Sequence, residues 1–211
     1  MGMTLSEIVY FLIAFAIVLS VHEASHALIA YYLGDPTAKV HGRLSLNPIR
    51  HIDVLGFLVL IFAHFGWGKP VPVNPSNFKH PVRDSALTAL AGPVSNFVLA
   101  FIFALLLRYV SSYVPLVVST ELWWIFDLSV VWGIFNLIPV PPLDGGKILG
   151  LLVPKRWENG YMRFQNKGIK YFVIFMLVDI FILGNLFGFS IVQFIVMNVY
   201  ELVRNAILFG M

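Results

Sequence analysis

The chain has 211 residues, of which 59% are hydrophobic and only 12% are charged, and its mean hydropathy is +0.84. This composition excludes an ordinary soluble domain, which needs more polar surface, and indicates an integral membrane protein. The net charge is +3, but the Lys and Arg residues lie between hydrophobic segments, where they would face anionic lipid. We therefore expect a lipid bilayer around the protein and no nucleic acid as a partner. The absence of cysteine excludes disulfides and thiolate metal sites.

The first hydrophobic segment, residues 8–33, is long enough to cross a membrane. It exceeds the core of a signal peptide and no basic region precedes it, so we expect a retained spanning helix. Residues 34–53 are polar and turn-rich, and the alternation in 38–46 predicts a short strand or hairpin arm. The next apolar run, 54–65, is too short to span and predicts a re-entrant segment.

Prolines at positions 70, 72, 75 and 81 exclude a helix over the segment that follows, which should be extended or looped. Further spans are predicted at 85–110, 122–138 and 169–187, and 190–207 is either a fifth span or an interfacial helix. The intervening loop 139–168 is rich in Pro, Gly and basic residues and has room for a short helix after Asp144. We therefore expect a single all-α polytopic membrane domain over residues 1–211. It should have four to six transmembrane helices, with a short re-entrant or β-like element between the first helix and the second full span.

The distribution of basic residues predicts the orientation in the membrane. Lys and Arg residues are concentrated in regions 34–84 and 139–168, whereas the amino terminus and residues 111–121 have none. Basic loops stay in the cytoplasm, so the amino terminus should lie outside, provided that 54–65 does not cross. The carboxyl half of the first helix then faces the cytoplasm.

The sequence HEASH lies inside the first predicted span. On a helix, His22 and His26 are one turn apart and project only about 40° from each other, so both imidazoles can bind one metal ion. Glu23 is adjacent and can act as a general base on water. Zn²⁺ suits such ligands best. A polar stripe that merely packs against other spans is the alternative, but ionisable groups inside a membrane are costly and are usually functional.

Two histidines are not a complete ligand set, so a third ligand is needed. The candidates in or beside apolar segments are His64, Asp127, Asp144 and Asp179. Asp144 follows the 122–138 span on the predicted cytoplasmic side, and Gly145 and Gly146 permit close backbone approach there. Asp127 should lie near the opposite face, and Asp179 is better explained by polar packing. We therefore favour Asp144, with His64 as a less suitable alternative.

Three segments, HEASH, AGPVSNFVLA and NLIPVPPLDGGKIL, together resemble the site-2 protease family of intramembrane zinc metalloproteases. The stretch GWGKPVPVNPSNF is also similar to the compact prokaryotic branch, which has no appended peptide-binding domain. The resemblance covers about residues 20–150. It implies His22, His26 and Asp144 as ligands of one Zn²⁺ and Glu23 as the catalytic base. It also implies that Asn96 faces the site.

Two other features have both functional and structural explanations. Asn96, inside a span, could stabilise a scissile carbonyl or a developing oxyanion, but an amide there also suits hydrogen bonding between helices. The segment 66–78 could offer an edge to which a substrate adds as a strand, or could be a surface loop.

The function expected from these features is intramembrane cleavage of peptide bonds within or near the transmembrane helix of single-span membrane proteins. An oligomer is compatible with the sequence. The main alternative is a metal-ion transporter or metal-binding membrane protein with the same ligands, which would leave Glu23 unexplained. A non-cleaving relative is a third candidate, but intact Glu23 argues against it.

Overall fold

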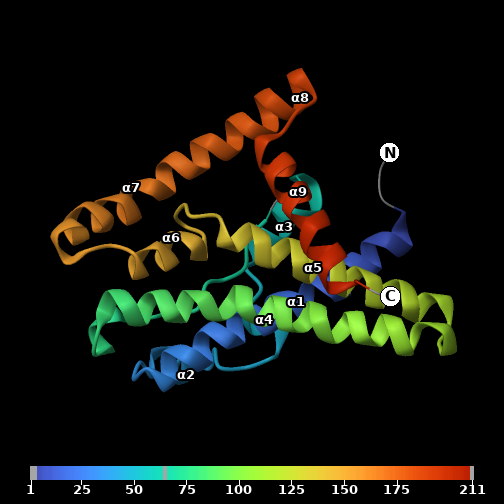
Figure 1. Ribbon diagram of the computed structural model, residues 1–211, viewed down its shortest axis with the longest axis horizontal. Coiled ribbons are helices and arrows are strands. Elements are labelled where there is room, and N and C mark those ends of the chain that lie inside the picture. The colour runs from blue at the N-terminus through green and yellow to red at the C-terminus, as the bar shows by residue number, and fades with distance from the viewer. Residues whose placement is uncertain (1–3, 64–65, 210–211) are drawn as a thin grey trace.

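The computed structural model describes residues 4–63 and 66–209, and the regular structure of these residues is helical (Figure 1). The long helices are α1 (Leu5–Tyr32), α4 (Pro81–Tyr109), α5 (Leu116–Leu137), α7 (Glu158–Leu177) and α9 (Ile191–Ile207). The short helices are α2 (Thr37–Val40), α3 (Val54–Ala63), α6 (Asp144–Ile148) and α8 (Asn185–Phe187). A π-helical segment, Val178–Gly184, joins α7 to α8.

Local sequence signals explain where the two longest helices begin and end. Thr4 and Glu7 form a reciprocal capping box at the start of α1, which satisfies amide groups that the helix leaves free. After α1, Gly34 has a φ of 107°, a conformation that side chains disfavour. In α4, Pro81 occupies the first turn, where its missing amide hydrogen is not needed.

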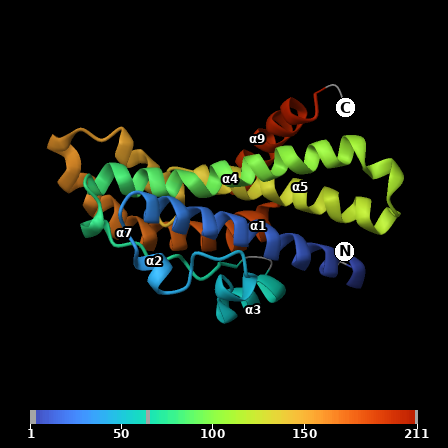
Figure 2. The ribbon, with the colours of Figure 1, turned by 90° about the horizontal axis from the view of Figure 1, so that it is seen from below.

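Helices α1, α4 and α5 lie side by side along the long axis of the molecule (Figures 1 and 2). Their contacts include the fully buried small residues Ala14, Ala100 and Ala104, which allow the helix backbones to approach closely. In Figure 2, α3 lies outside this group, on the far side of α1 from α4. The three packed helices form the framework that carries the site.

Helix α7 diverges from the three packed helices, and α9 returns from its far end toward α5 (Figure 1). Phe172 and Met176 of α7 are buried against Leu143, in the connection between α5 and α6. Tyr200 of α9 donates a hydrogen bond of 2.5 Å to Asp127 of α5. The connection that leads to Asp144 is thus packed between α5 and α7.

The all-α polytopic prediction is confirmed, because four helical segments of the described chain are long and apolar enough to cross a membrane. They are Leu5–Tyr32, Pro81–Tyr109, Leu116–Leu137 and Lys155–Phe187. The last begins well before the predicted residue 169, because the polar residues after 155 continue the helix. Helix α9 has 17 residues and is not among these four. The protein is therefore a multi-pass membrane protein.

The predicted strand at residues 38–46 is wrong. Residues Thr37–Val40 form one helical turn instead, because the Asp35 carboxylate accepts hydrogen bonds from the Thr37 amide and hydroxyl and so favours a helical start. Gly42, with a φ of 66°, ends this turn. Among the described residues, β pairing in this region is limited to one antiparallel bridge between Ile52 and Gly68. The apolar run after residue 53 is helical, and its re-entrant placement stays a prediction.

Candidate metal centre

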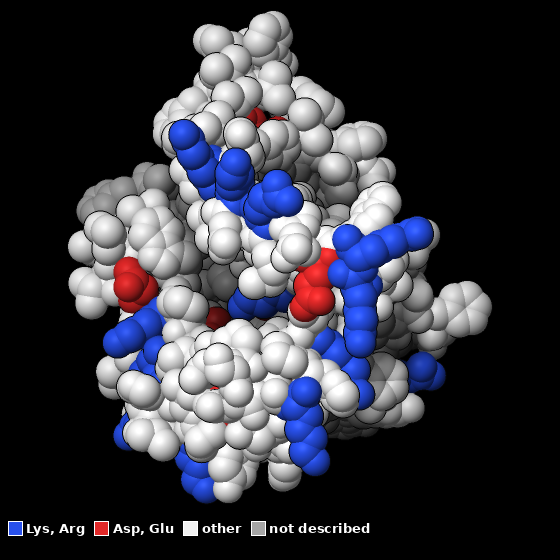
Figure 3. All heavy atoms as spheres, turned by 90° about the vertical axis from the view of Figure 1, so that its left-hand side faces the viewer, with Lys and Arg blue, Asp and Glu red and all other residues white. Residues whose placement is uncertain are grey.

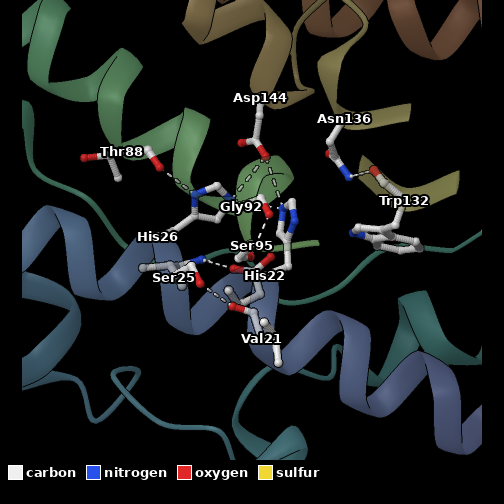
Figure 4. A network of polar contacts seen from close by, with 12 residues as sticks. Val21, His22, Ser25, His26, Thr88, Gly92, Ser95, Trp132, Asn136 and Asp144 are labelled. Atoms are coloured by element: carbon white, nitrogen blue, oxygen red, sulfur yellow. Dashed lines mark hydrogen bonds and ion pairs between the residues drawn. The ribbon is translucent and has the colours of Figure 1, made fainter. Parts of the chain in front are cut away.

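The side chains of His22, His26 and Asp144 meet at one point between α1, α4 and α6 (Figure 4). The two Nε2 atoms of the histidines are 3.0 Å apart. The Oδ2 atom of Asp144 lies 3.1 Å from Nε2 of His22 and 3.2 Å from Nε2 of His26. All three side chains are buried, and they are the one group of three or more potential metal ligands within the described residues.

The histidine rings are held by α4. Nδ1 of His26 lies 2.7 Å from the carbonyl oxygen of Thr88, which can accept its hydrogen and so leaves Nε2 free as a ligand (Figure 4). One turn further along α4, Gly92 faces both rings. A Cβ atom at this position would lie 2.5 Å from Cε1 of His22 and 2.5 Å from Nε2 of His26. The absent side chain of Gly92 therefore makes room for the two imidazoles.

Asp144 is the first residue of α6, and the two glycines after it explain how it reaches the histidines. A Cβ atom on Gly145 would lie 2.3 Å from the carbonyl oxygen of Leu137, and one on Gly146 would lie 2.7 Å from the nitrogen of Pro141. The backbone of α6 therefore packs directly against the end of α5. Burial opposes ionisation of Asp144, but the two neighbouring imidazoles outweigh it and lower the pKa of this carboxyl below its usual value.

This arrangement fits a tetrahedral metal ion. Zn²⁺ binds histidine nitrogen and carboxylate oxygen at about 2.0–2.2 Å, which places neighbouring ligand atoms about 3.3 Å apart. The three distances between ligand atoms are close to this value. The Oδ2 atom of Asp144, which is buried, forms no hydrogen bond within the described residues, as expected for an atom that faces a cation. The residues present therefore fit a three-ligand metal site with one open position.

A cavity of about 490 Å³ adjoins the cluster. Its lining includes the three candidate ligands and Glu23 from α1, and Lys147 lies in it on the α6 side. The opposite wall is an extended segment that contributes Gly66, Trp67, Gly68, Pro70, Val71, Val73 and Pro75, here called the 66–75 wall. The Oε2 atom of Glu23 accepts a hydrogen bond of 3.0 Å from the Val71 amide. The expected base thus lies between the metal ligands and this wall.

Comparison with known proteins identifies the family of this chain. The sequence model of peptidase family M50 matches residues 113–180, which include Asp144. The protein "Putative zinc metalloprotease YwhC" of Bacillus subtilis is 39% identical over 188 residues, which are 86% of this chain and 84% of that protein. The chain belongs to peptidase family M50. The resemblance to the site-2 protease family and the prediction of a metalloprotease are thereby confirmed.

Other relatives match shorter parts of the chain. "Putative zinc metalloprotease Rip2" of Mycolicibacterium smegmatis is 34% identical over 131 residues, 60% of this chain and 51% of that protein. "Putative zinc metalloprotease MJ0611" of Methanocaldococcus jannaschii is 37% identical over 71 residues, 32% of this chain and 34% of that protein. No solved structure matches the chain.

The other candidate ligands of this M50 peptidase lie elsewhere or outside the described residues. Asp127 accepts the hydrogen bond from Tyr200. Asp179, in the π-helical segment, accepts hydrogen bonds from the Ser190 hydroxyl at 2.5 Å and the Ile191 amide at 2.7 Å. Each of these carboxylates thus ties α9 to another helix. His64 lies outside the described residues.

Asn96 lies one turn beyond Gly92 on α4 and is therefore on the same face of that helix. Its side chain is fully buried, and neither its amide nitrogen nor its amide oxygen has a hydrogen-bond partner within the described residues. An unsatisfied buried amide costs free energy, so this residue is not explained by hydrogen bonding between the helices seen here. Its role in the M50 reaction stays a prediction.

Three residues around the 66–75 wall were not predicted from the sequence. Asp35, Arg43 and His51 lie in the polar, turn-rich region 34–53, yet all three are buried. For Asp35 a local signal existed, since an Asp two residues before a Thr is typical of a side chain that accepts backbone hydrogen bonds. Arg43 and His51 have no such signal, because their partners are distant in the sequence.

Proposed function

We propose that this M50 protein is an intramembrane zinc metalloprotease that cleaves peptide bonds within or near the transmembrane helix of single-span membrane proteins. The observation that carries the proposal is the position of the ligand cluster. His22, His26 and Asp144 meet beside Glu23 in a bundle whose helices are long and apolar enough to span a membrane. Ionisable groups in such a setting are expensive to maintain, which favours a function for them.

His22, His26 and Asp144 would hold one Zn²⁺ per chain, as the geometry of their ligand atoms allows. When bound, the ion supplies Lewis-acid polarisation of a carbonyl and lowers the pKa of water. Glu23 faces the same cavity, and its carboxylate would take the proton from the attacking water and pass it to the leaving amine. The hydrogen bond from the Val71 amide to Oε2 of Glu23 holds this carboxylate between α1 and the 66–75 wall.

The 66–75 wall is the part of the cavity suited to hold a substrate backbone. Pro70 and Pro72 keep it out of a helix as far as Asn74, Pro75 begins a short 3-10 helix, and the Val71 amide points toward Glu23. A substrate in an extended conformation can exchange backbone hydrogen bonds with such an edge, whereas a helical one cannot, because its own hydrogen bonds occupy those groups. The substrate helix would therefore have to unwind locally before cleavage.

The orientation of the protein belongs to the same proposal. Figure 3 shows Lys and Arg side chains gathered around a hollow at the end of the molecule where α2 and the starts of α4 and α7 lie. Basic groups favour the cytoplasmic side of a membrane, which supports a cavity that opens to the cytoplasm and an amino terminus outside.

A metal-ion transporter with the same ligands is the alternative. A permeation path needs successive sites through which an ion can pass, whereas the described residues hold a single cluster of three ligands. A transporter would also leave unexplained the carboxylate of Glu23, which lines the cavity but is not one of the three clustered ligands. The cluster therefore favours hydrolysis over transport.

The test is a cleavage assay in detergent with a purified single-span substrate, combined with measurement of bound zinc. Wild-type protein should bind about one zinc per chain and cleave the substrate. Glu23→Gln should keep the zinc and lose cleavage, while His22→Ala, His26→Ala and Asp144→Ala should each lose the zinc. Cleavage by Glu23→Gln at the wild-type rate, or full zinc occupancy in Asp144→Ala, would contradict the proposal.

A further inference from the structure

The 66–75 wall is attached to the rest of the protein at three places. At its amino-terminal end, the Lys69 amide donates to the His51 carbonyl at 2.8 Å, and the Arg43 guanidinium donates to the Lys69 carbonyl. Both Arg43 and His51 are buried, which fixes this end. In the middle, the Val71 amide donates to Glu23. The third attachment, at the carboxyl-terminal end, is made by Asp35.

Asp35 is fully buried and uses both carboxylate oxygens. Its Oδ2 accepts a hydrogen bond of 2.7 Å from the Asn74 amide, and its Oδ1 accepts one of 2.6 Å from Nδ2 of Asn77. The Thr37 amide and hydroxyl complete the set, at 3.1 Å and 2.5 Å. Burial opposes ionisation of Asp35, but these four donors outweigh it and lower the pKa of the carboxyl. Asp35 is therefore an ionised anchor that joins Thr37, at the start of α2, to Asn74 and Asn77 at the end of the wall.

The position of Asp35 in the chain links the wall to the candidate ligands. Asp35 follows α1 after a single turn, and its own amide donates to the carbonyl of Ala30 on that helix at 2.9 Å. The same helix carries His22, Glu23 and His26. Through Asp35, the end of the wall is thus held to the helix that provides both histidines and the base. Asn74 itself is next to Val73, which lines the cavity.

We propose that Asp35 is a positioning residue for the substrate: acting through Asn74 and Asn77, it holds the 66–75 wall at the separation from α1 that an extended peptide needs. This inference rests on the proposed function, since it assigns a role to the wall in binding the peptide that is cut. Asp35 does not line the cavity, and its side-chain hydrogen bonds go to none of the three candidate metal ligands. Without it, the wall beyond Val71 would lose its attachment to α1, and substrate binding would weaken while the ligand cluster stayed intact.

The variants Asp35→Asn and Asn77→Ala test this role. Asp35→Asn keeps the shape of the side chain but sets an amide donor against groups that are themselves donors, and Asn77→Ala removes one donor from the wall side. A matched control is Asp179→Asn, because Asp179 is equally buried and also accepts from a hydroxyl and a backbone amide, but joins α9 to the segment after α7. Zinc content, KM and kcat are measured for each, with the same single-span substrate.

We expect Asp35→Asn and Asn77→Ala to raise KM about tenfold, the effect of one lost hydrogen bond to a charged group, with kcat changed about twofold or less. Zinc content should stay at the wild-type value in both, and Asp179→Asn should leave KM unchanged. An unchanged KM in Asp35→Asn, or an equal rise in Asp179→Asn, would overturn the proposal. Loss of zinc from Asp35→Asn would also overturn it, because the residue would then support the metal ligands.

A second measurement separates this proposal from the proposed function. Hydrogen exchange of the Val71 and Asn74 amides reports on the wall without any substrate. Both amides should exchange faster in Asp35→Asn than in the wild-type protein, and their exchange rates should be unchanged in Asp179→Asn. If zinc-loaded wild-type protein cuts no single-span substrate, the proposed function fails, and unchanged exchange in Asp35→Asn would show independently that Asp35 does not hold the wall.

Discussion

At the scale of single residues, the centre depends as much on a missing side chain as on the ligands. His22 and His26 lie against Gly92, where a Cβ atom would come within 2.5 Å of both rings. Real Cβ contacts are longer than this, so any larger residue at position 92 must displace an imidazole. The metal site therefore requires close approach of α1 and α4 at this point.

Gly92→Ala should lower the zinc content sharply, because the added methyl group pushes the imidazoles away from their shared position. Alanine is otherwise the better helix former, so the helix itself should not be weakened. Zinc is measured by elemental analysis of the purified protein. The control is Gly160→Ala on α7, where a Cβ atom would meet nothing within 4 Å. A full zinc content in Gly92→Ala would show that α1 and α4 can separate without loss of the site.

Asn96 is buried without a hydrogen-bond partner within the described residues, so it is a candidate to contact the substrate carbonyl rather than to join helices. If its amide stabilises the carbonyl under attack, Asn96→Ala should keep its zinc and lose cleavage by about two to three orders of magnitude, as when an oxyanion donor is removed. The measurement is kcat at saturating substrate together with zinc content. Wild-type turnover in Asn96→Ala would show that Asn96 does not act on the substrate and contributes only to helix packing.

At the scale of elements, the site joins a rigid helix to an extended wall. Helix α1 carries both histidines and Glu23 on consecutive turns, and its capping box and long packing surface hold it in place. The 66–75 wall has little regular structure of its own and depends on attachments to other segments. Helical ligands are thus fixed locally, whereas the proposed peptide-binding edge is fixed by tertiary contacts.

If the substrate must be extended to bind along the 66–75 wall, substrates whose helix unwinds easily should be cut fastest. A Gly or Pro near the scissile bond should speed cleavage of a single-span substrate, because Gly weakens a helix by about 1 kcal/mol relative to Ala and Pro by about 3 kcal/mol. A uniform Leu span should be resistant. The rates are compared in detergent for spans of matched length. Equal rates for the Leu span and the Gly- or Pro-containing span would contradict local unwinding, though not the metal site.

At the scale of the whole molecule, three helices form a packed group and the rest of the chain lies around it. Helix α1 carries the histidines and α4 packs against their rings. Helix α6 follows the end of α5 and brings Asp144 to the histidines (Figures 1 and 4). The basic residues gather at the end where α2 and the starts of α4 and α7 lie (Figure 3). This asymmetry of charge makes a definite prediction about topology.

The chain has no cysteine, so single cysteines can report on topology without background. Cysteines at Ser76 and Asn159, which are exposed, should react with a membrane-impermeant reagent only from the cytoplasmic side, and one at Ser112 only from outside. Labelling is compared in intact and in opened cells. External labelling at Ser76 would mean that residues 54–65 cross the membrane and would reverse the assigned side of the cavity.

The sequence by itself determined the features that depend on neighbouring residues. Hydropathy over some twenty residues located the spans, since crossing a membrane is a local requirement of length and composition. The pairing of His22, Glu23 and His26 followed from helical periodicity alone, because four residues make about one turn. Asp144 was favoured as the third ligand because it follows the 122–138 span on the predicted cytoplasmic side, and the structure brings it to within 3.2 Å of both histidines.

The tertiary structure decided what depends on residues that are far apart in the chain. The contact from Glu23 to Val71 spans 48 residues and that from Asp35 to Asn74 spans 39, and no local pattern specifies either. The turn of helix at Thr37–Val40, where alternation predicted a strand, forms because Asp35 is buried and directs its oxygens to both Thr37 and the wall. Hydropathy cannot anticipate such a carboxylate, because its burial is stabilised by donors that only the folded chain brings together.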